Sequence, residues 1–263
     1  MKIAVCIKQV PAADNAAIDP ITKRIVREGL QSILNPFDLY AVEEAVRLRE
    51  RYGGEVIALS MGPQKAQTSL RESIAIGADR AVLLSDRAFG GSDTWATSYA
   101  LFRAIDTIGN VDIVICGKQA VDGDTAQVGP GIAAHFDWRQ ATYVTEIRSI
   151  KDNVIQVVRM NEYGFDICEL NLPAVITVVK GINMPRVPTL KGVLAANACD
   201  IPVWKPNDIG ADLDKIGLDP SPTRVVKTQP PPARTGLAQR IEGSPSECAD
   251  KLINSLQQLG FAG

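Results

Sequence analysis

The sequence predicts an α/β fold: a parallel sheet with an antiparallel extension, followed by a C-terminal arm. Up to Ala141, short apolar runs alternate with helical patterns, which is typical of βαβ units and a parallel sheet. After it, polar and apolar residues alternate, as in antiparallel strands. Beyond Pro206 the chain is polar and rich in proline. We therefore expect an α/β domain over residues 1–205 and an arm with a final helix over residues 206–263, a division that suits 263 residues.

The parallel half follows from short β-branched apolar runs, most of which end at glycine or proline. The predicted strands are residues 2–7, 55–61, 80–85 and 111–116. The first helix begins well, with Asn35 as a candidate N-cap and Pro36 at the tolerated first position. The predicted helices are residues 36–52, 64–76, 95–108 and one from about residue 128. A further β-branched run, residues 24–27, precedes the first helix.

The second half is predicted to be an antiparallel meander over residues 141–172, joined to one more apolar strand. Its strands are residues 142–150, 153–160, 165–172 and 174–179. Residues 181–198 are expected to be irregular, and an amphipathic helix over residues 246–259 closes the chain. An arm that buries little against its own domain embraces another chain or is loose, and we favour the embrace.

The loop from Gly117 to Val128 is the strongest candidate for a ligand site. It connects the strand at residues 111–116 to a helix N-terminus, where unpaired backbone N–H groups and the helix dipole favour an anion. Thr125 and Gln127 add neutral donors, so a phosphate or diphosphate suits the position. Loops after three other predicted strands leave the same edge of the sheet, which suggests an elongated ligand. The alternative is an ordinary capped turn.

Composition disfavours several classes of function. The net charge of −2 gives no basic excess to neutralise a nucleic acid. No apolar run approaches the roughly 20 residues that cross a bilayer, and no signal peptide precedes the first strand, so we expect no membrane insertion and a cytoplasmic protein. The five cysteines form no CxxC pair and His135 is the only histidine, which disfavours a metal site and catalytic side chains. GxGxxG and GxxxxGK[ST] are absent, which does not exclude an adenine nucleotide.

Several motifs in a fixed order resemble one known family. They are Asn35-Pro-Phe-Asp38, Ala41-Val-Glu-Glu-Ala-Val46, Met61-Gly-Pro63, Ala75-Ile-Gly-Ala-Asp79 and Gly117-Lys-Gln-Ala-Val-Asp-Gly-Asp-Thr-Ala-Gln-Val-Gly-Pro130. Over essentially its whole length, the chain resembles the small (beta) subunit of electron-transfer flavoproteins. The resemblance implies an adenine nucleotide alpha hydrolase-like fold and a heterodimer with a large (alpha) subunit that carries FAD, around which the C-terminal arm wraps.

The resemblance also implies an adenine-nucleotide site. Its residues would be Cys6, Asn35, Pro36, Phe37, Asp38, Met61, Gly117, Lys118, Gln119, Ala120, Val121, Asp122, Gly123, Asp124, Thr125, Ala126, Gln127 and Val128. In ordinary members this site holds a structural AMP. In the electron-bifurcating branch it holds the ADP half of a second FAD, whose flavin receives hydride from NADH.

The loop at residues 85–94 resembles the bifurcating branch, in which it borders the flavin and the NAD site. Its residues are Asp86, Arg87, Ala88, Phe89, Gly90, Gly91, Ser92, Asp93 and Thr94. Gly90 and Gly91 would let the backbone approach a ligand, Arg87 would meet phosphate, and Ser92, where alanine is expected, would cap the next helix. The alternative is a turn with a flexible glycine pair.

Leu190 resembles the family's recognition leucine, an exposed anchor for an acyl-CoA dehydrogenase. The alternative is a leucine folded back on its own domain. The main hypothesis is a bifurcating subunit that sends one electron to the large-subunit FAD and the other to ferredoxin or flavodoxin. The alternatives are a conventional subunit that holds AMP and an adenine-nucleotide hydrolase.

Overall fold

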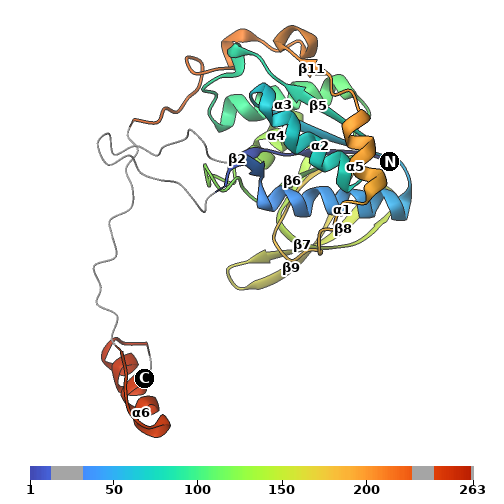
Figure 1. Cartoon of the computed structure of the whole chain (residues 1–263). Helices are drawn as coiled ribbons and strands as arrows, with labels where there is room; N and C mark the ends of the chain where they lie inside the picture. Colours follow the sequence, from blue (N-terminus) through green and yellow to red (C-terminus); the bar gives the residue numbers. More distant parts are fainter. Residues whose placement is uncertain (13–31, 227–239, 262–263) are drawn as a thin grey trace. The chain divides into compact units, whose positions relative to one another are not determined.

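A nine-stranded sheet organises the first part of the chain (Figure 1), in a computed structural model that describes residues 1–12, 32–226 and 240–261. In spatial order the strands are β11 (Val203–Trp204), β5 (Arg80–Leu84), β4 (Glu55–Met61), β1 (Lys2–Cys6), β6 (Ile113–Gly117), β10 (Ala174–Val178), β7 (Arg139–Lys151), β8 (Val154–Asn161) and β9 (Gly164–Asn171). The strands from β11 to β7 are parallel, whereas β8 and β9 are antiparallel. The predicted fold class is therefore confirmed.

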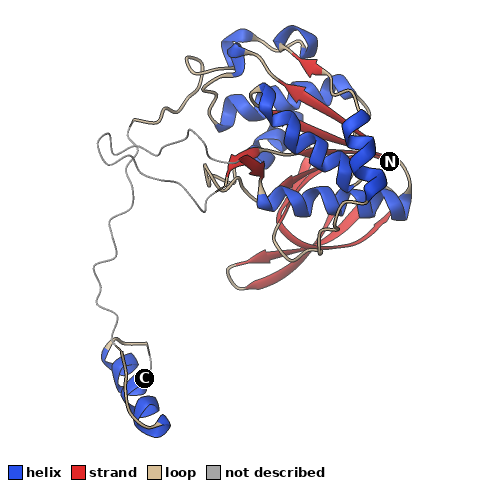
Figure 2. Ribbon diagram, viewed as in Figure 1, coloured by secondary structure: helices blue, strands red, loops and turns tan. Residues whose placement is uncertain are grey.

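Helices cover both faces of the sheet (Figure 2). One face carries α1 (Pro36–Tyr52), α2 (Gln67–Ile76), which follows the short η2 (Gln64–Ala66), and α5 (Leu190–Ala198). The other face carries α3 (Thr94–Ile108) and α4 (Val128–Phe136). Successive strand residues point to opposite faces, so Ile3 and Val5 join one buried cluster while Ala4 and Cys6 join the other. This burial on both faces explains the continuous apolar runs of the parallel strands.

Two features differ from the sequence prediction. A separate antiparallel pair, β2 (Gln9–Pro11) and β3 (Ser32–Leu34), was not predicted. The predicted irregular region contains α5, because the Thr189 side chain accepts a hydrogen bond from the amide of Gly192 and caps the helix. The β-branched run at residues 24–27 lies outside the described residues.

The chain divides into two compact units, Met1–Val226 and Lys227–Gly263, so the first unit extends beyond the predicted boundary at residue 205. Residues beyond it include the short helices η4 (Pro206–Ile209) and η5 (Leu213–Lys215). Ile209 and Ile216 are buried against the face with α3, which explains why this stretch stays with the domain. None of the described helices is both long enough and apolar enough to span a membrane.

The second unit contains α6 (Pro245–Gln258). Its start is fixed by a capping box, in which the Ser244 side chain accepts from the amide of Glu247 and the Glu247 carboxylate accepts from the amide of Ser244. Leu252, Ile253 and Leu256 are exposed along this helix. The predicted final helix is therefore present with an uncovered apolar side, and its contact with a large subunit stays a prediction.

Candidate functional site

The strand order reverses between β1 and β6. From β1 the chain passes through α1 to β4 on one side and on to β5, and α3 then returns it to β6 on the other side. In open parallel sheets, ligands bind beyond the carboxyl ends of the strands at such a point. Cys6 and Cys116 are register partners there. The neighbouring Cys6 thiol and burial raise the pKa of Cys116, so that group adds no negative charge beneath an anion.

Asn35 joins the start of α1 to the loop after β6. Its Nδ2 donates to the carbonyl of Gln119 over 2.9 Å, and its Oδ1 accepts from the amide of Val121 over 3.1 Å. Asn35 is the N-cap residue of α1 and Pro36 takes the first helical position, as predicted, but the Asn35 side chain makes no capping hydrogen bond because these distant bonds occupy it. The site residues Asn35 and Gln119–Val121 are thus brought together.

Gly117 lies where only a glycine fits. A β-carbon at this position would come within 2.8 Å of the Phe37 Cβ and closer still to Asp38. The Asp38 carboxylate accepts from the amide of Lys8 over 2.7 Å. Burial raises the pKa of Asp38 to about 7, although hydrogen bonds from Asn35, Lys8 and Gly117 oppose the shift. The start of α1 therefore packs directly on the end of β6.

The backbone between Asp124 and Gln127 offers three consecutive N–H donors. Asp124 and Ala126 have φ values of 55°, and Gln127 follows in the right-handed region. Consecutive N–H groups in such an alternation make an anion-binding nest. The amides of Thr125, Ala126 and Gln127 donate to no other residue in the described part of the chain. They precede the N-terminus of α4, so the loop fits a diphosphate.

Two acidic side chains of the loop are held by neighbours. The Asp122 carboxylate pairs with the Lys8 ammonium over 2.8 Å, and Asp124 accepts from the Gln119 side chain. The Lys118 ammonium lies 5.9 Å from the Phe37 ring centre. The Lys8 ammonium thus offsets the charge of Asp122, whereas the partner of Asp124 is neutral.

The two predicted loops meet at Thr94, whose hydroxyl donates to the Gln127 side chain over 2.9 Å. Asp93, not Ser92, caps α3, since its Oδ1 accepts from the amides of Trp95 and Ala96. Ser92 instead donates to the carbonyl of Phe89 and accepts from the amide of Gly217. The predicted cap at Ser92 is therefore wrong.

The glycine pair has a packing role. Gly91 has a φ of 79°, and a β-carbon there would come 2.8 Å from the Leu218 Cβ. Asp86 caps the short helix η3 (Arg87–Phe89) by accepting from the amide of Ala88. Arg87 is exposed. The left-handed backbone at Gly91 is thus explained by contact within the chain, and a ligand contact at this loop stays a prediction.

The other predicted residues lie at separate places. Met61 is half-buried at the end of β4, on the same sheet edge as the loop. Leu190 is the first residue of α5 and its side chain is 76% exposed, so it does not fold back on the domain. The sequence missed Lys8, and it missed Tyr143, whose ring lies 5.1 Å from the Lys118 ammonium and whose φ of 60° is rare for a bulky residue. No local pattern marks either residue.

Two surface hollows lie elsewhere. One, of about 400 Å³, is lined by Asn110, Asp112 and Pro173, and the other, of about 240 Å³, by Arg80 and Pro202 among others. These residues precede or begin their strands, so both hollows open at the amino edge of the sheet. They are separate from the loop at residues 117–128.

Comparisons with known proteins agree on one family. The family model described as "Electron transfer flavoprotein domain" matches residues 22–209. The chain is 46% identical over 258 residues to the electron transfer flavoprotein subunit beta of Thermoanaerobacterium thermosaccharolyticum, covering 97% of this chain and 98% of the relative. It is 45% identical over 259 residues to the caffeyl-CoA reductase-Etf complex subunit CarD of Acetobacterium woodii, covering 98% of each. It is 45% identical over 260 residues to the protein FixA of Azorhizobium caulinodans, covering 96% and 92%.

Proposed function

This chain belongs to the electron transfer flavoprotein family as a beta subunit, and from that premise we propose that it holds the ADP half of a FAD in an electron-bifurcating heterodimer. The observation that carries the proposal is the donor array at Thr125, Ala126 and Gln127, beside the reversal of strand order. When bound, FAD would accept hydride from NADH and release the two electrons to separate acceptors.

The chain's own residues would bind and orient this cofactor. The amides of residues 125–127 would donate to the diphosphate, with Asn35 keeping the loop in place through its two hydrogen bonds. Thr94 links this loop to the loop at residues 85–94. Exposed Arg87 would meet the phosphates of NADH on that side.

Three partners follow from the proposal. The large (alpha) subunit would receive one electron on its FAD, with the exposed apolar side of α6 as part of its contact. An acyl-CoA dehydrogenase-type flavoenzyme would dock on Leu190, and the name of the Acetobacterium relative, which includes a CoA-ester reductase complex, supports this class. Ferredoxin or flavodoxin would receive the other electron.

The cofactor count of the purified heterodimer tests the proposal. We expect two FAD per heterodimer, and NADH should bleach their absorbance. One FAD together with one AMP, and no bleaching by NADH, would instead establish the conventional subunit. Turnover of ATP by the chain would favour a hydrolase, for which the described residues offer no group of three His, Cys, Asp or Glu placed to bind a metal.

A further inference from the structure

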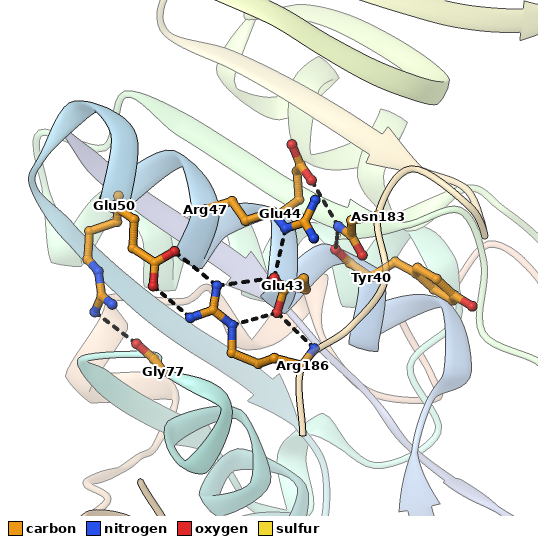
Figure 3. Close-up of polar contacts among 9 residues, drawn as sticks. Tyr40, Glu43, Glu44, Arg47, Glu50, Gly77, Asn183 and Arg186 are labelled. Carbon is orange, nitrogen blue, oxygen red and sulfur yellow. Dashed lines mark hydrogen bonds and ion pairs between the residues drawn. The ribbon is translucent and has the colours of Figure 1, made fainter. Parts of the chain in front are cut away.

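A cluster of ion pairs fastens the chain before Leu190 to α1 (Figure 3). The Arg186 guanidinium donates to Glu43 from Nε over 2.8 Å and from a terminal nitrogen over 3.1 Å. It also donates to both oxygens of Glu50, over 2.6 and 3.0 Å. The backbone amide of Arg186 donates to Glu43 as well. One arginine therefore holds its own segment to two positions of the helix.

The buried Glu43 carboxylate fixes the position of the segment that carries Arg186. Its side chain is only 2% exposed, and Arg47 donates to its second oxygen over 2.8 Å. Burial raises the pKa of Glu43, but hydrogen bonds from Arg186 and Arg47 outweigh burial and leave the pKa below its usual range. A buried carboxylate is costly once its partner is removed, so the segment has one strongly preferred position. Asn183 adds bonds to the carbonyl of Tyr40 and to Glu44.

The far end of the same region is fastened too. Arg71 donates to the carbonyls of Ala196 and Cys199 at the end of α5. Gly192 packs against the carbonyl of Ala75 so closely that a β-carbon would clash. We call residues 183–198 the docking segment. Both of its ends are thus held to α1 and α2.

Along its length the docking segment exposes apolar side chains. The residues are Met184, Val187, Leu190 and Leu194, with exposed fractions of 82%, 85%, 76% and 60%. A fixed segment loses little conformational freedom when a partner binds, so its exposed apolar groups give more net affinity than those of a loose one. A single well-placed apolar anchor can dominate such a contact.

We propose that Arg186 is a positioning residue for partner docking: it holds the docking segment in its binding conformation without touching the partner's pocket or the cofactor. The proposal rests on the proposed function, in which Leu190 meets an acyl-CoA dehydrogenase-type partner. It adds the residue that keeps this contact preorganised. Arg186 lies 143 residues from Glu43 in the sequence, so no local pattern connects them.

The experiment uses the full heterodimer and a purified acyl-CoA dehydrogenase, with the heterodimer as the varied reactant. Arg186→Met should raise the KM for the heterodimer about tenfold and leave kcat unchanged, because the loss is one of preorganised binding. Arg186→Lys keeps the positive charge but loses the planar set of donors, so its KM should lie between those of the wild type and Arg186→Met. Arg47→Met, which removes a hydrogen bond from the same carboxylate, is the matched control and should leave KM unchanged. FAD content confirms that each variant is assembled.

A combination with Leu190→Ala separates the inference from the proposed function. If Arg186 acts through Leu190, Arg186→Met should raise KM much less in the Leu190→Ala background than in the wild type. A raised KM for Leu190→Ala with none for Arg186→Met would overturn the inference and keep the docking function. An unchanged KM for both would overturn both.

Hydrogen exchange of residues 183–190 tests the positioning without any partner. Exchange should accelerate in Arg186→Met and stay unchanged in Arg47→Met. Unchanged exchange in Arg186→Met would also overturn the inference.

Discussion

Two of the three buried carboxyl groups of helix α1, those of Asp38 and Glu43, serve different regions of the molecule. Asp38 supports the candidate nucleotide loop, and burial raises its pKa to about 7. Glu43 supports the docking segment; burial raises its pKa too, but hydrogen bonds from Arg186 and Arg47 bring the pKa below its usual range. Asp38 receives hydrogen bonds mainly from neutral groups, those of Asn35, Lys8 N–H and Gly117 N–H. Burial outweighs the hydrogen bonds at Asp38, whereas the hydrogen bonds from two arginines outweigh burial at Glu43.

Glu44, next along the helix, follows the same rule. Its pKa is raised by burial, and its hydrogen-bond donor is the neutral Asn183 side chain. At the start of α1, Asp38 receives its hydrogen bonds mainly from neutral donors. At Glu43, further along the helix, the charged Arg186 and Arg47 side chains supply the hydrogen bonds. In the proposed function, the main-chain donors at residues 125–127 would be the principal attraction for the diphosphate.

Removing the Asp38 carboxyl group should have the largest effect on the pH dependence of stability. The folded-state pKa of Asp38, about 7, exceeds its usual 3.8, so its contribution to stability is present below pH 3.8 and is lost as pH rises through 7. The difference corresponds to about 4 kcal/mol. Asp38→Asn should flatten the decline in the unfolding free energy of the heterodimer between pH 4 and pH 8, measured by urea denaturation.

The contribution of Glu43 to stability should depend on pH in the opposite direction. Glu43, with its lowered pKa, stabilises the fold above its usual pKa and loses that contribution as pH falls through the lowered value. Glu43→Gln should therefore reduce the loss of unfolding free energy at acidic pH, a loss that Asp38→Asn should not change. Identical pH profiles for wild type and Asp38→Asn would break the comparison.

A change of packing, without a change of charge, sharpens the comparison. Gly117→Ala should destabilise the chain by about 3 kcal/mol, because its β-carbon has no room beside Phe37 and Asp38. Gly123→Ala in the same loop is the control, since a β-carbon there meets nothing within 4 Å. Urea denaturation and nucleotide content measure both variants. Equal losses in the two would contradict the close packing of α1 on β6.

A matched pair of asparagines compares the two regions directly. Asn35→Ala and Asn183→Ala each remove two hydrogen bonds to α1 or its neighbours, and each should cost about 2 kcal/mol of stability. Only Asn35→Ala should weaken nucleotide binding, by about tenfold, because Asn35, unlike Asn183, is bonded to the loop at residues 117–128. Equilibrium dialysis of FAD or AMP separates the two effects. A similar loss of affinity in Asn183→Ala would show a general effect of stability.

Much of the fold could be predicted from the sequence, because the parallel strands are continuous apolar runs and the helices end at glycines such as Gly53 and Gly77. The loop at residues 117–128 was identifiable from its place between strand and helix. Long-range bonds were not identifiable. The Asn35 side chain forms hydrogen bonds with Gln119 and Val121, which lie more than 80 positions away in the sequence, and it caps no backbone amide of α1. The helix α5 was hidden by Pro185, Pro188 and Gly192, which resemble an irregular segment.

The structure of the assembled heterodimer with its nucleotide tests the central claim most directly. Diphosphate oxygens within about 3.2 Å of the amides of Thr125, Ala126 and Gln127 are the predicted result. A nucleotide bound elsewhere, with these three amides facing water or another part of the complex, would contradict it.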